Sequence, residues 1–192
     1  MSYTRRMPRS FRAVLLSAVS LCLICGLAVR PARATTVAPL SFEELVRQSS
    51  SVVYARVIDV QGQWSADRQR IDSLVTVAVI KGLKGSATAE LTLTVPGGQI
   101  GRYLNLMPGA PSFARGDLAV LFLTASGPRL PVTTGFTQAI YRVVRDGASG
   151  TPLVTPPVVG HAGAPIVRGD RRRQPVSLEA FEQAVRAAQE AR

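Results

Sequence analysis

The sequence predicts a mainly β protein: a small OB-like barrel of five to six antiparallel strands, with a short N-terminal helix and a C-terminal helix. The first observation is a set of segments in which β-branched and apolar residues alternate with polar ones, as in half-buried strands. The second is a serine-capped amphipathic segment at each end of this set. A closed barrel is favoured over an open sandwich, because closure removes the strand edges that a five-stranded sheet exposes.

Residues 1–34 are predicted to form an export signal. Four arginines between residues 5 and 12 precede an uncharged apolar run over residues 13–28, and Ala32-Arg33-Ala34 matches the small-x-small pattern of a signal-peptidase site. We expect cleavage at about Ala34, which leaves a periplasmic or extracellular protein. The alternative is a retained membrane anchor, but the apolar run is shorter than the roughly 20 residues that a span needs.

Cleavage changes what the composition implies. Cys22 and Cys25 both lie in the apolar run, so the mature protein is expected to contain no disulfide and no cysteine chemistry. Six of the 23 basic residues and none of the 12 acidic residues precede residue 35, which leaves 17 against 12 and lowers the formal net charge from +11 to +5. A charge of this size in an exported protein does not favour a nucleic-acid partner.

The domain expected over residues 35–155 begins with a helix and a strand. Ser41 and Glu44 have the spacing of a capping box, so a helix is predicted from Phe42 to about Gln48. The first strand is predicted over residues 51–60, followed by a loop over residues 61–69. Alternation places Val53, Ala55 and Val57 on one face of this strand and Val52, Tyr54, Ile58 and Val60 on the other.

The segment from Ile71 to Gly101 is the centre of the predicted fold. It contains two alternating strands, over residues 71–80 and 91–95, and a turn at 81-KGLKG-85 between them. The two lysines of this turn are expected to keep it in water. Pro96 has no backbone N–H to donate, so the third strand should end there.

A long irregular connection is predicted over residues 96–117, where glycine and proline recur throughout. Connections of this length inside a compact domain are often functional. The apolar segment 118–123 is predicted to be the most buried strand, 138–144 a fifth strand and 152–155 a short further one. Residues 156–175 are predicted to be a linker rich in proline, glycine and arginine, and residues 176–192 a helix capped by Ser177.

Several motifs resemble a family of uncharacterised secreted bacterial proteins over roughly residues 41–145. The most specific are Lys81-Gly82, Pro96-Gly97-Gly98, Gly109-Ala110-Pro111 and Gly116-Asp117. More distantly, the strand order resembles the netrin-like barrel of tissue metalloproteinase inhibitors. Those inhibitors chelate the protease zinc through a disulfide-tethered N-terminal cysteine. The mature chain is expected to have no cysteine, so that mechanism is not carried over.

The residues that carry catalysis or bind cofactors in other proteins are sparse. The only histidine, His161, falls in the predicted linker, which is unsuited to holding a catalytic base in place. Gly97 and Gly98 are interpreted as a tight bend and not as a phosphate cradle, because no helix opens after them. Asp59, Asp67 and Asp72 lack regular ligand spacing, so they are interpreted as solvated residues and not as a cation site. We expect no metal and no cofactor.

The best candidate for ligand contact is Trp64, the only tryptophan, in the loop that carries ligands in OB-type barrels. Its ring either stacks on a ligand or folds back over the end of the barrel, and both remain open. The full set of candidate contact residues is Trp64, Arg68, Arg70, Lys81, Lys84, Gly97, Gly98 and Tyr103.

The favoured function is therefore an exported, non-catalytic binding module for an envelope or secreted protein, with a protease-associated role as one version. Membrane contact is expected only through the signal before cleavage. One alternative is a hydrolase or lyase whose site assembles in three dimensions. Its residues would be Asp59, Asp72, Asp117, Tyr103 and Tyr141. The other is a structural envelope protein that acts through its ends.

Overall fold

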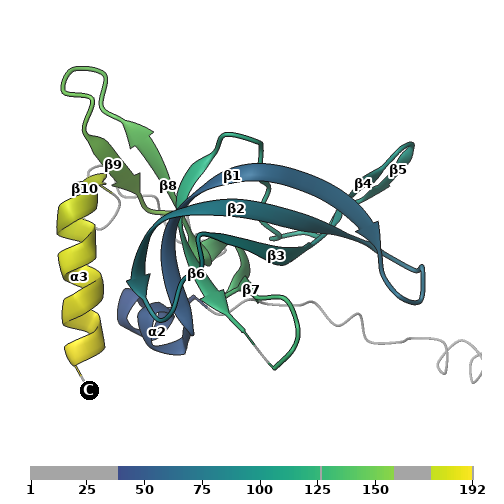
Figure 1. Ribbon diagram of the computed structural model, residues 1–192, viewed down its shortest axis with the longest axis horizontal. Helices are drawn as coiled ribbons and strands as arrows, with labels where there is room; N and C mark the ends of the chain where they lie inside the picture. The colour runs from purple at the N-terminus through teal and green to yellow at the C-terminus, as the bar shows by residue number, and fades with distance from the viewer. Residues whose placement is uncertain (1–38, 126, 158–173, 192) are drawn as a thin grey trace, which may run out of the picture. The chain divides into compact units, whose positions relative to one another are not determined.

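The computed structural model describes residues 39–125, 127–157 and 174–191. These residues form a large antiparallel sheet with one helix from the N-terminal side of the chain and one from the C-terminal side (Figure 1), which confirms the mainly β class. The predicted export signal, most of the predicted linker and His161 lie outside the described residues. Within the described part of the chain, no helix is long and apolar enough to cross a membrane.

The described residues contain ten strands, two α-helices and one 3-10 helix. The helices are α2 (Phe42–Gln48), η1 (Phe136–Ala139) and α3 (Leu178–Glu190). The strands are β1 (Ser51–Trp64), β2 (Ile71–Lys84), β3 (Glu90–Pro96), β4 (Gly98–Ile100), β5 (Tyr103–Asn105), β6 (Leu118–Thr124), β7 (Val132–Thr133), β8 (Ile140–Arg145), β9 (Pro152–Thr155) and β10 (Val176–Ser177). The main sheet has the order β10-β9-β8-β6-β1-β2-β3, β7 pairs with the end of β6, and β4 and β5 form a separate hairpin.

The prediction of five to six strands is wrong. The segment over residues 96–117 was expected to be irregular, but it contains β4 and β5. Strand pairing among the described residues follows an open path from β10 to β3, with no closed barrel assigned. One hydrogen bond crosses from the edge of this path toward β7: the Thr94 N–H donates to the Pro131 carbonyl at 2.9 Å.

The β1–β2 hairpin is longer than predicted at both ends. Residues 61–64 continue β1 and residues 81–84 continue β2, so neither stretch is the loop or turn that was expected. The ladder accommodates this length with three register shifts. One of the shifts lies between Val57 and Asp59. A bulge there moves the side chains that follow it to the other face of the strand. Val60 therefore packs against the core that contains Val57, and not on the opposite face as predicted.

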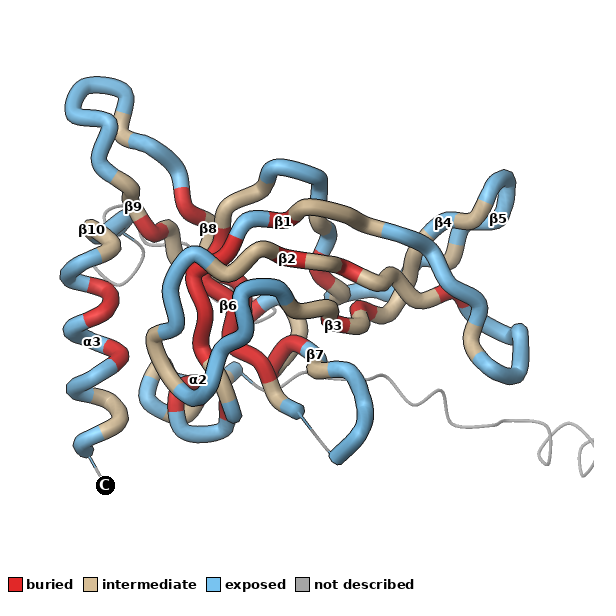
Figure 2. Tube along the Cα trace, viewed as in Figure 1, coloured by how far each residue is buried: buried red, intermediate tan, exposed pale blue. Residues whose placement is uncertain are grey.

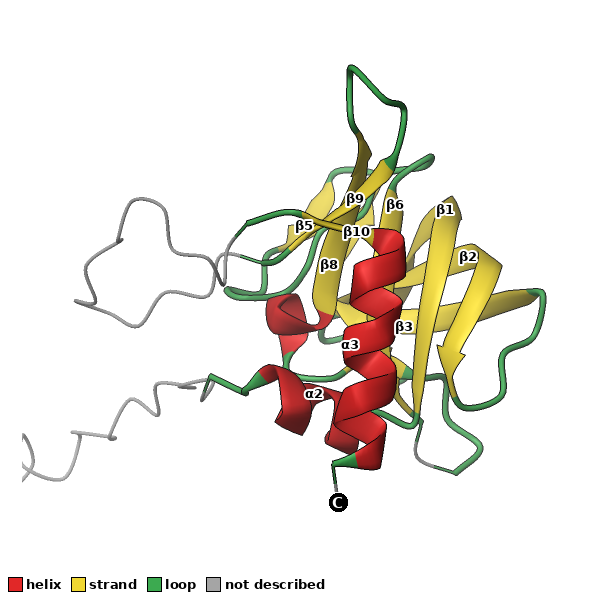
Figure 3. Cartoon of the chain, turned by 90° about the vertical axis from the view of Figure 1, so that its left-hand side faces the viewer, coloured by secondary structure: helices red, strands yellow, loops and turns green. Residues whose placement is uncertain are grey.

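Two apolar cores lie on opposite faces of the sheet. Figure 3 shows α2 and α3 together on one face, and Figure 2 shows the buried residues concentrated where β1 and β6 pair. The core under the helices contains Leu45, Val46, Val52, Tyr54, Val120, Phe122, Ala139, Val143, Val154, Phe181 and Val185. The other contains Val53, Ala55, Val57, Val75, Val77, Leu93, Val95, Ala119, Leu121, Leu123 and Ile140. As predicted, β6 is buried on both faces.

Both helices begin at the predicted caps. At α2, the Ser41 hydroxyl accepts from the Glu44 N–H, and the Glu44 carboxylate accepts from the Ser41 N–H at 2.9 Å, which is a capping box. At α3, the Ser177 hydroxyl accepts from the Ala180 N–H. The C-terminal end of α2 is bound from β2, where the Lys84 ammonium donates to the Val46 and Ser49 carbonyls at 2.5 and 2.7 Å.

Candidate functional site

The bend after β3 brings the β4–β5 hairpin against the start of β2. Gly97 has a φ of +90°, which a residue with a side chain adopts only under strain, and its N–H donates to the Ile71 carbonyl at 3.1 Å. The Ser73 hydroxyl donates to the Gly97 carbonyl at 2.7 Å. A Cβ atom on Gly98 would lie 2.6 Å from the Ser73 Oγ atom. Gly97 and Gly98 therefore lie between β3 and β4 at positions where a Cβ atom would meet close neighbours.

The far end of β1 provides the second support for the hairpin. A Cβ atom on Gly62 would lie 2.2 Å from the carbonyl oxygen of Gln99, so β4 approaches β1 more closely than any side chain at position 62 permits. The Asn105 side-chain amide also donates to the Ile71 carbonyl at 3.3 Å. The hairpin is thus fixed by backbone contacts on β1 and β2, and Figure 1 shows it at the end of the sheet away from α3.

Five large apolar side chains are exposed on and beside this hairpin. We call them the hairpin surface: Trp64, Tyr103, Leu104, Leu106 and Met107. Leu106 is 77% exposed and Leu104 is 60% exposed. The rings of Trp64 and Tyr103 are in edge contact, with centroids 5.7 Å apart. Trp64 thus contacts β5 and does not fold into the core, yet it remains 37% exposed.

A groove of about 270 Å³ lies beside the hairpin surface. Its floor includes Val75 and Val95, which are buried members of the core on the face opposite the helices. The remaining lining comes from Val60, Ser73, residues 96–99, residues 104–107 and residues 110–113. No lining residue is charged. The groove therefore suits an uncharged apolar group.

The far wall of the groove is held by Arg142 of β8. Its guanidinium donates to the Asp117 carboxylate at 2.5 Å and to the Ser112 carbonyl, and it lies 5.4 Å from the centroid of the Phe113 ring. Asp117 in turn accepts from the Ala114 N–H at 2.9 Å. These contacts fix the segment that carries Ser112 and Phe113, so Arg142 is a positioning residue for the groove.

The other predicted contact residues lie in two separate places. Arg68 and Arg70 stay near Trp64 in the β1–β2 connection, where Arg70 pairs with Asp72 at 3.3 Å. Lys81 and Lys84 lie at the opposite end of β2, next to the helices. The structure therefore brings together Trp64, Tyr103, Gly97 and Gly98, and it separates the two lysines from them. Lys81 and Lys84 also contact protein groups, in contrast to the water-facing turn that was expected.

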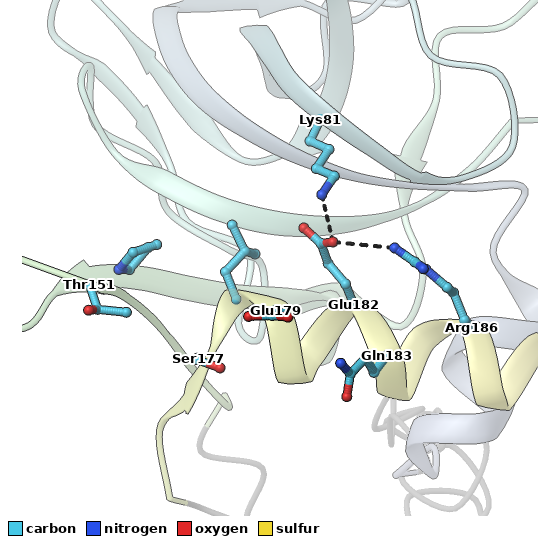
Figure 4. Close-up of a pocket in the computed structure, with 9 residues that line it drawn as sticks. Lys81, Thr151, Ser177, Glu179, Glu182, Gln183 and Arg186 are labelled. Atoms are coloured by element: carbon cyan, nitrogen blue, oxygen red, sulfur yellow. Dashed lines mark hydrogen bonds and ion pairs between the residues drawn. The ribbon is translucent and has the colours of Figure 1, made fainter.

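The lysine end of β2 borders a second pocket of about 540 Å³, which is lined mainly by the start of α3 (Figure 4). Within it, the Glu182 carboxylate is 8% exposed and binds the Lys81 ammonium at 2.6 Å and the Arg186 guanidinium at 3.6 Å. Figure 4 shows both cations directed at the same carboxylate oxygen. This pair links α3 to β2, so its evident role is to fix the helix on the sheet.

The five acid and tyrosine residues considered for catalysis have separate partners. Asp59 accepts from Gln61 and pairs with Arg115, Asp72 pairs with Arg70, and Asp117 pairs with Arg142. The hydrogen bond from Gln61, together with Arg115, holds the pKa of Asp59 below its usual value.

Tyr103 contacts Trp64, whereas Tyr141 packs against Phe122 and Phe181. Burial, with a contribution from the Glu43 carboxylate, raises the pKa of Tyr141 to about 12. Among the residues that the structure describes, no group of three or more His, Cys, Asp or Glu side chains is placed to bind a metal ion.

Five contributors to the site were missed from the sequence: Gly62, Leu104, Leu106, Met107 and Arg142. Apart from Asn105, the run Tyr103 to Met107 is apolar within a segment rich in glycine and proline, and this was the available signal for Leu104, Leu106 and Met107. Gly62 and Arg142 act through contacts distant in sequence and leave no local signal. Comparisons with protein-family models, with curated proteins and with solved structures find no match to this chain.

Proposed function

We propose that this protein is an exported, non-catalytic binding module that holds an envelope or secreted protein at the hairpin surface and its groove. The observation that carries the proposal is the set of five exposed apolar side chains beside a groove that reaches core residues. Contiguous exposed apolar residues on a folded domain are typical of interaction sites. The glycines support the hairpin and Arg142 holds the far wall of the groove, and a site held in one arrangement lowers the entropy cost of binding.

The size and chemistry of the groove favour a protein partner over a cofactor. Pockets for drug-sized ligands and cofactors span roughly 300–1,000 Å³ and carry a few convergent polar groups. This groove is about 270 Å³ and has no charged side chain, and the Ser73, Gln99 and Asn105 side chains in its lining donate to backbone carbonyls. A single large apolar side chain of a partner fits these properties, and such buried anchors contribute much of the binding energy in protein interfaces.

An OB-like barrel is part of this proposal. The hydrogen bond from Thr94 to Pro131 brings β3 toward the segment that precedes β7, and β7 pairs with β6. This contact supports a sheet that curves toward closure. The groove would then lie at the open end of the barrel, where its core residues are reached from outside.

The test starts from the full sequence expressed in a bacterium with a C-terminal tag. N-terminal sequencing of the protein recovered from the periplasm or medium should give a terminus at about residue 35. That protein then serves as bait for an envelope extract under mild crosslinking. The matched variants are Leu106→Asp, on the hairpin surface, and Val144→Asp, an exposed position on β8.

We expect the same partner to be recovered at similar yield with the unmodified protein and with Val144→Asp, and to be lost with Leu106→Asp. An aspartate at position 106 places a charge against an apolar interface, which binding must desolvate. Equal recovery with all three proteins would remove the hairpin surface from consideration. Adding the recovered partner to secreted proteases, with and without the protein, then tests the protease-associated version.

A further inference from the structure

The outer edge of β5 has no pairing strand among the described residues. β5 pairs with β4 and with no other strand, in the register Gly98 to Asn105, Gln99 to Leu104 and Ile100 to Tyr103. The connection between them is the two-residue turn Gly101-Arg102, with a positive φ at Gly101. This is the arrangement of a tight two-residue hairpin.

The register identifies which backbone groups face outward. In a two-residue hairpin the pair next to the turn exchanges hydrogen bonds, and hydrogen-bonded and non-hydrogen-bonded pairs then alternate. Ile100 and Tyr103 form the first pair, so Leu104 belongs to a non-hydrogen-bonded pair. Its N–H and C=O therefore point to the free edge, away from β4.

The free edge and the groove meet at the same residues. Leu104 and Asn105 belong to β5 and also line the groove, and Leu106 and Met107 continue the lining directly after the strand. A strand paired with β5 has side chains alternating between two faces. Every second side chain of such a strand is directed to the groove side of the hairpin.

We propose that the partner binds as an extended segment that adds a strand to the outer edge of β5 and inserts one large apolar side chain into the groove. This inference rests on the proposed function and specifies the class of partner. Main-chain hydrogen bonds to Leu104 provide register, and the groove provides side-chain selectivity, which is how added strands are recognised in general.

The charges on this side of the protein indicate which residues the bound segment carries at its anchor and next to it. The groove has no charged lining residue, so the anchor is neutral and apolar. At the turn of the hairpin, the Arg102 guanidinium lies 5.2 Å from the centroid of the Tyr103 ring and donates to its hydroxyl at 3.1 Å. Among the described residues no carboxylate pairs with Arg102. An acidic residue of the segment, placed toward the turn, matches this cation.

The test uses octapeptides of alternating threonine and valine as probes. One carries a central tryptophan, a second a central aspartate, and a third the tryptophan with N-methyl groups on alternate amides of one edge. Binding to the full exported protein is measured by calorimetry. The paired variants are Leu104→Pro and Leu104→Ala: both remove the leucine side chain, but only proline removes the outward N–H.

We expect the tryptophan peptide to bind at least about tenfold more tightly than the aspartate peptide and the peptide methylated on its pairing edge. Leu104→Pro should bind it about fivefold or more weakly than Leu104→Ala, the effect of one lost hydrogen bond. Proline is compatible with an edge strand, so both variants should keep the melting temperature of the unmodified protein.

Equal binding by the two Leu104 variants, together with equal binding of the methylated peptide, overturns strand addition. Failure of every peptide to bind overturns it as well. Neither result affects the pull-down with Leu106→Asp, so the proposed function is judged separately. If sedimentation shows a dimer of the unmodified protein that Leu104→Pro dissociates, the occupant of the edge is a second copy of the chain, and the proposed partner is wrong.

Discussion

The rings of Trp64 and Tyr103 lie 5.7 Å apart and meet at 64°, which joins the end of β1 to β5. Contact geometry of this kind between aromatic rings adds to the stabilisation from burial. The contact also fixes the orientation of the exposed Trp64 ring. Trp64 is held against Tyr103 on the hairpin surface without being buried, so a partner that covers this surface meets a ring that is already oriented.

The close approach at Gly62 predicts that even a methyl group there disturbs the site. In Gly62→Ala the new Cβ atom meets the Gln99 carbonyl at 2.2 Å, so β4 must move. We expect a loss of about 1–3 kcal/mol in the free energy of unfolding, as for other overpacked positions. Urea denaturation measures this loss.

Gly147→Ala is the matched control, because nothing lies within 4 Å of a Cβ atom at that position. It should change the free energy of unfolding by less than about 0.5 kcal/mol. Similar stability for the two variants would show that β4 does not lie against β1 at Gly62.

The ion pair between Lys81 of β2 and Glu182 of α3 predicts that the packing of α3 on the sheet contributes to stability through this contact. Lys81→Met leaves a carboxylate that is 8% exposed with only Arg186 at 3.6 Å. Because the Lys81 side chain is 52% exposed, solvent screens the pair, and we expect a loss of about 1–2 kcal/mol in the free energy of unfolding. The double change Lys81→Met with Glu182→Leu should recover most of it, since no unpaired charge remains.

The control for this pair is Arg47→Met, which removes the exposed contact between Arg47 and Glu44 at 4.0 Å. It should cost less than about 0.5 kcal/mol in the same urea experiment. If Lys81→Met proves no more destabilising than Arg47→Met, the ion pair does not fix α3.

The raised pKa of Tyr141 predicts a loss of stability in alkali. The unfolded tyrosine ionises near its ordinary pKa of 10.0, whereas the folded one stays neutral until about 12. Between these values the unfolded state binds fewer protons than the folded state. The contribution is therefore fully present below pH 10 and falls by up to about 2–3 kcal/mol by pH 12.

Tyr141→Phe removes this titration, so its free energy of unfolding should fall less steeply between pH 10 and pH 12. Parallel curves for the unmodified protein and Tyr141→Phe would contradict the burial of the Tyr141 hydroxyl.

Local pattern predicted the elements whose determinants are local. Alternation identified β1, β2, β3 and most of β8, although the predicted first two residues of β8, 138 and 139, belong to η1. A continuous apolar run identified β6, and serine caps identified α2 and α3. All of these signals lie within a few residues. The bulge after Val57 was not predictable in this way, since it is a property of the ladder with β2. The same holds for the extension of β2 through Lys81 and Lys84, where a glycine-containing segment remains paired with β1.

The candidate site was predicted only in part, because some of its residues have local signals and others are brought together by contacts distant in sequence. Trp64 and Tyr103 were selected as a lone tryptophan and an aromatic residue of an irregular segment, and they are in contact. Lys81 is close to Trp64 in sequence, but ten residues of β2 at about 3.3 Å each place it roughly 30 Å from Ile71. Strand length thus separates residues that a short turn would have brought together.

The most direct test of the central claim uses the single tryptophan of the chain. Incorporation of 5-fluorotryptophan places one fluorine label at Trp64 and none in an unlabelled partner. The partner recovered in the pull-down is titrated into the labelled protein, and the fluorine resonance is followed beside calorimetry. The account predicts a change in the resonance that saturates with the calorimetric isotherm. Saturable binding that leaves the resonance unchanged would show that the partner binds elsewhere.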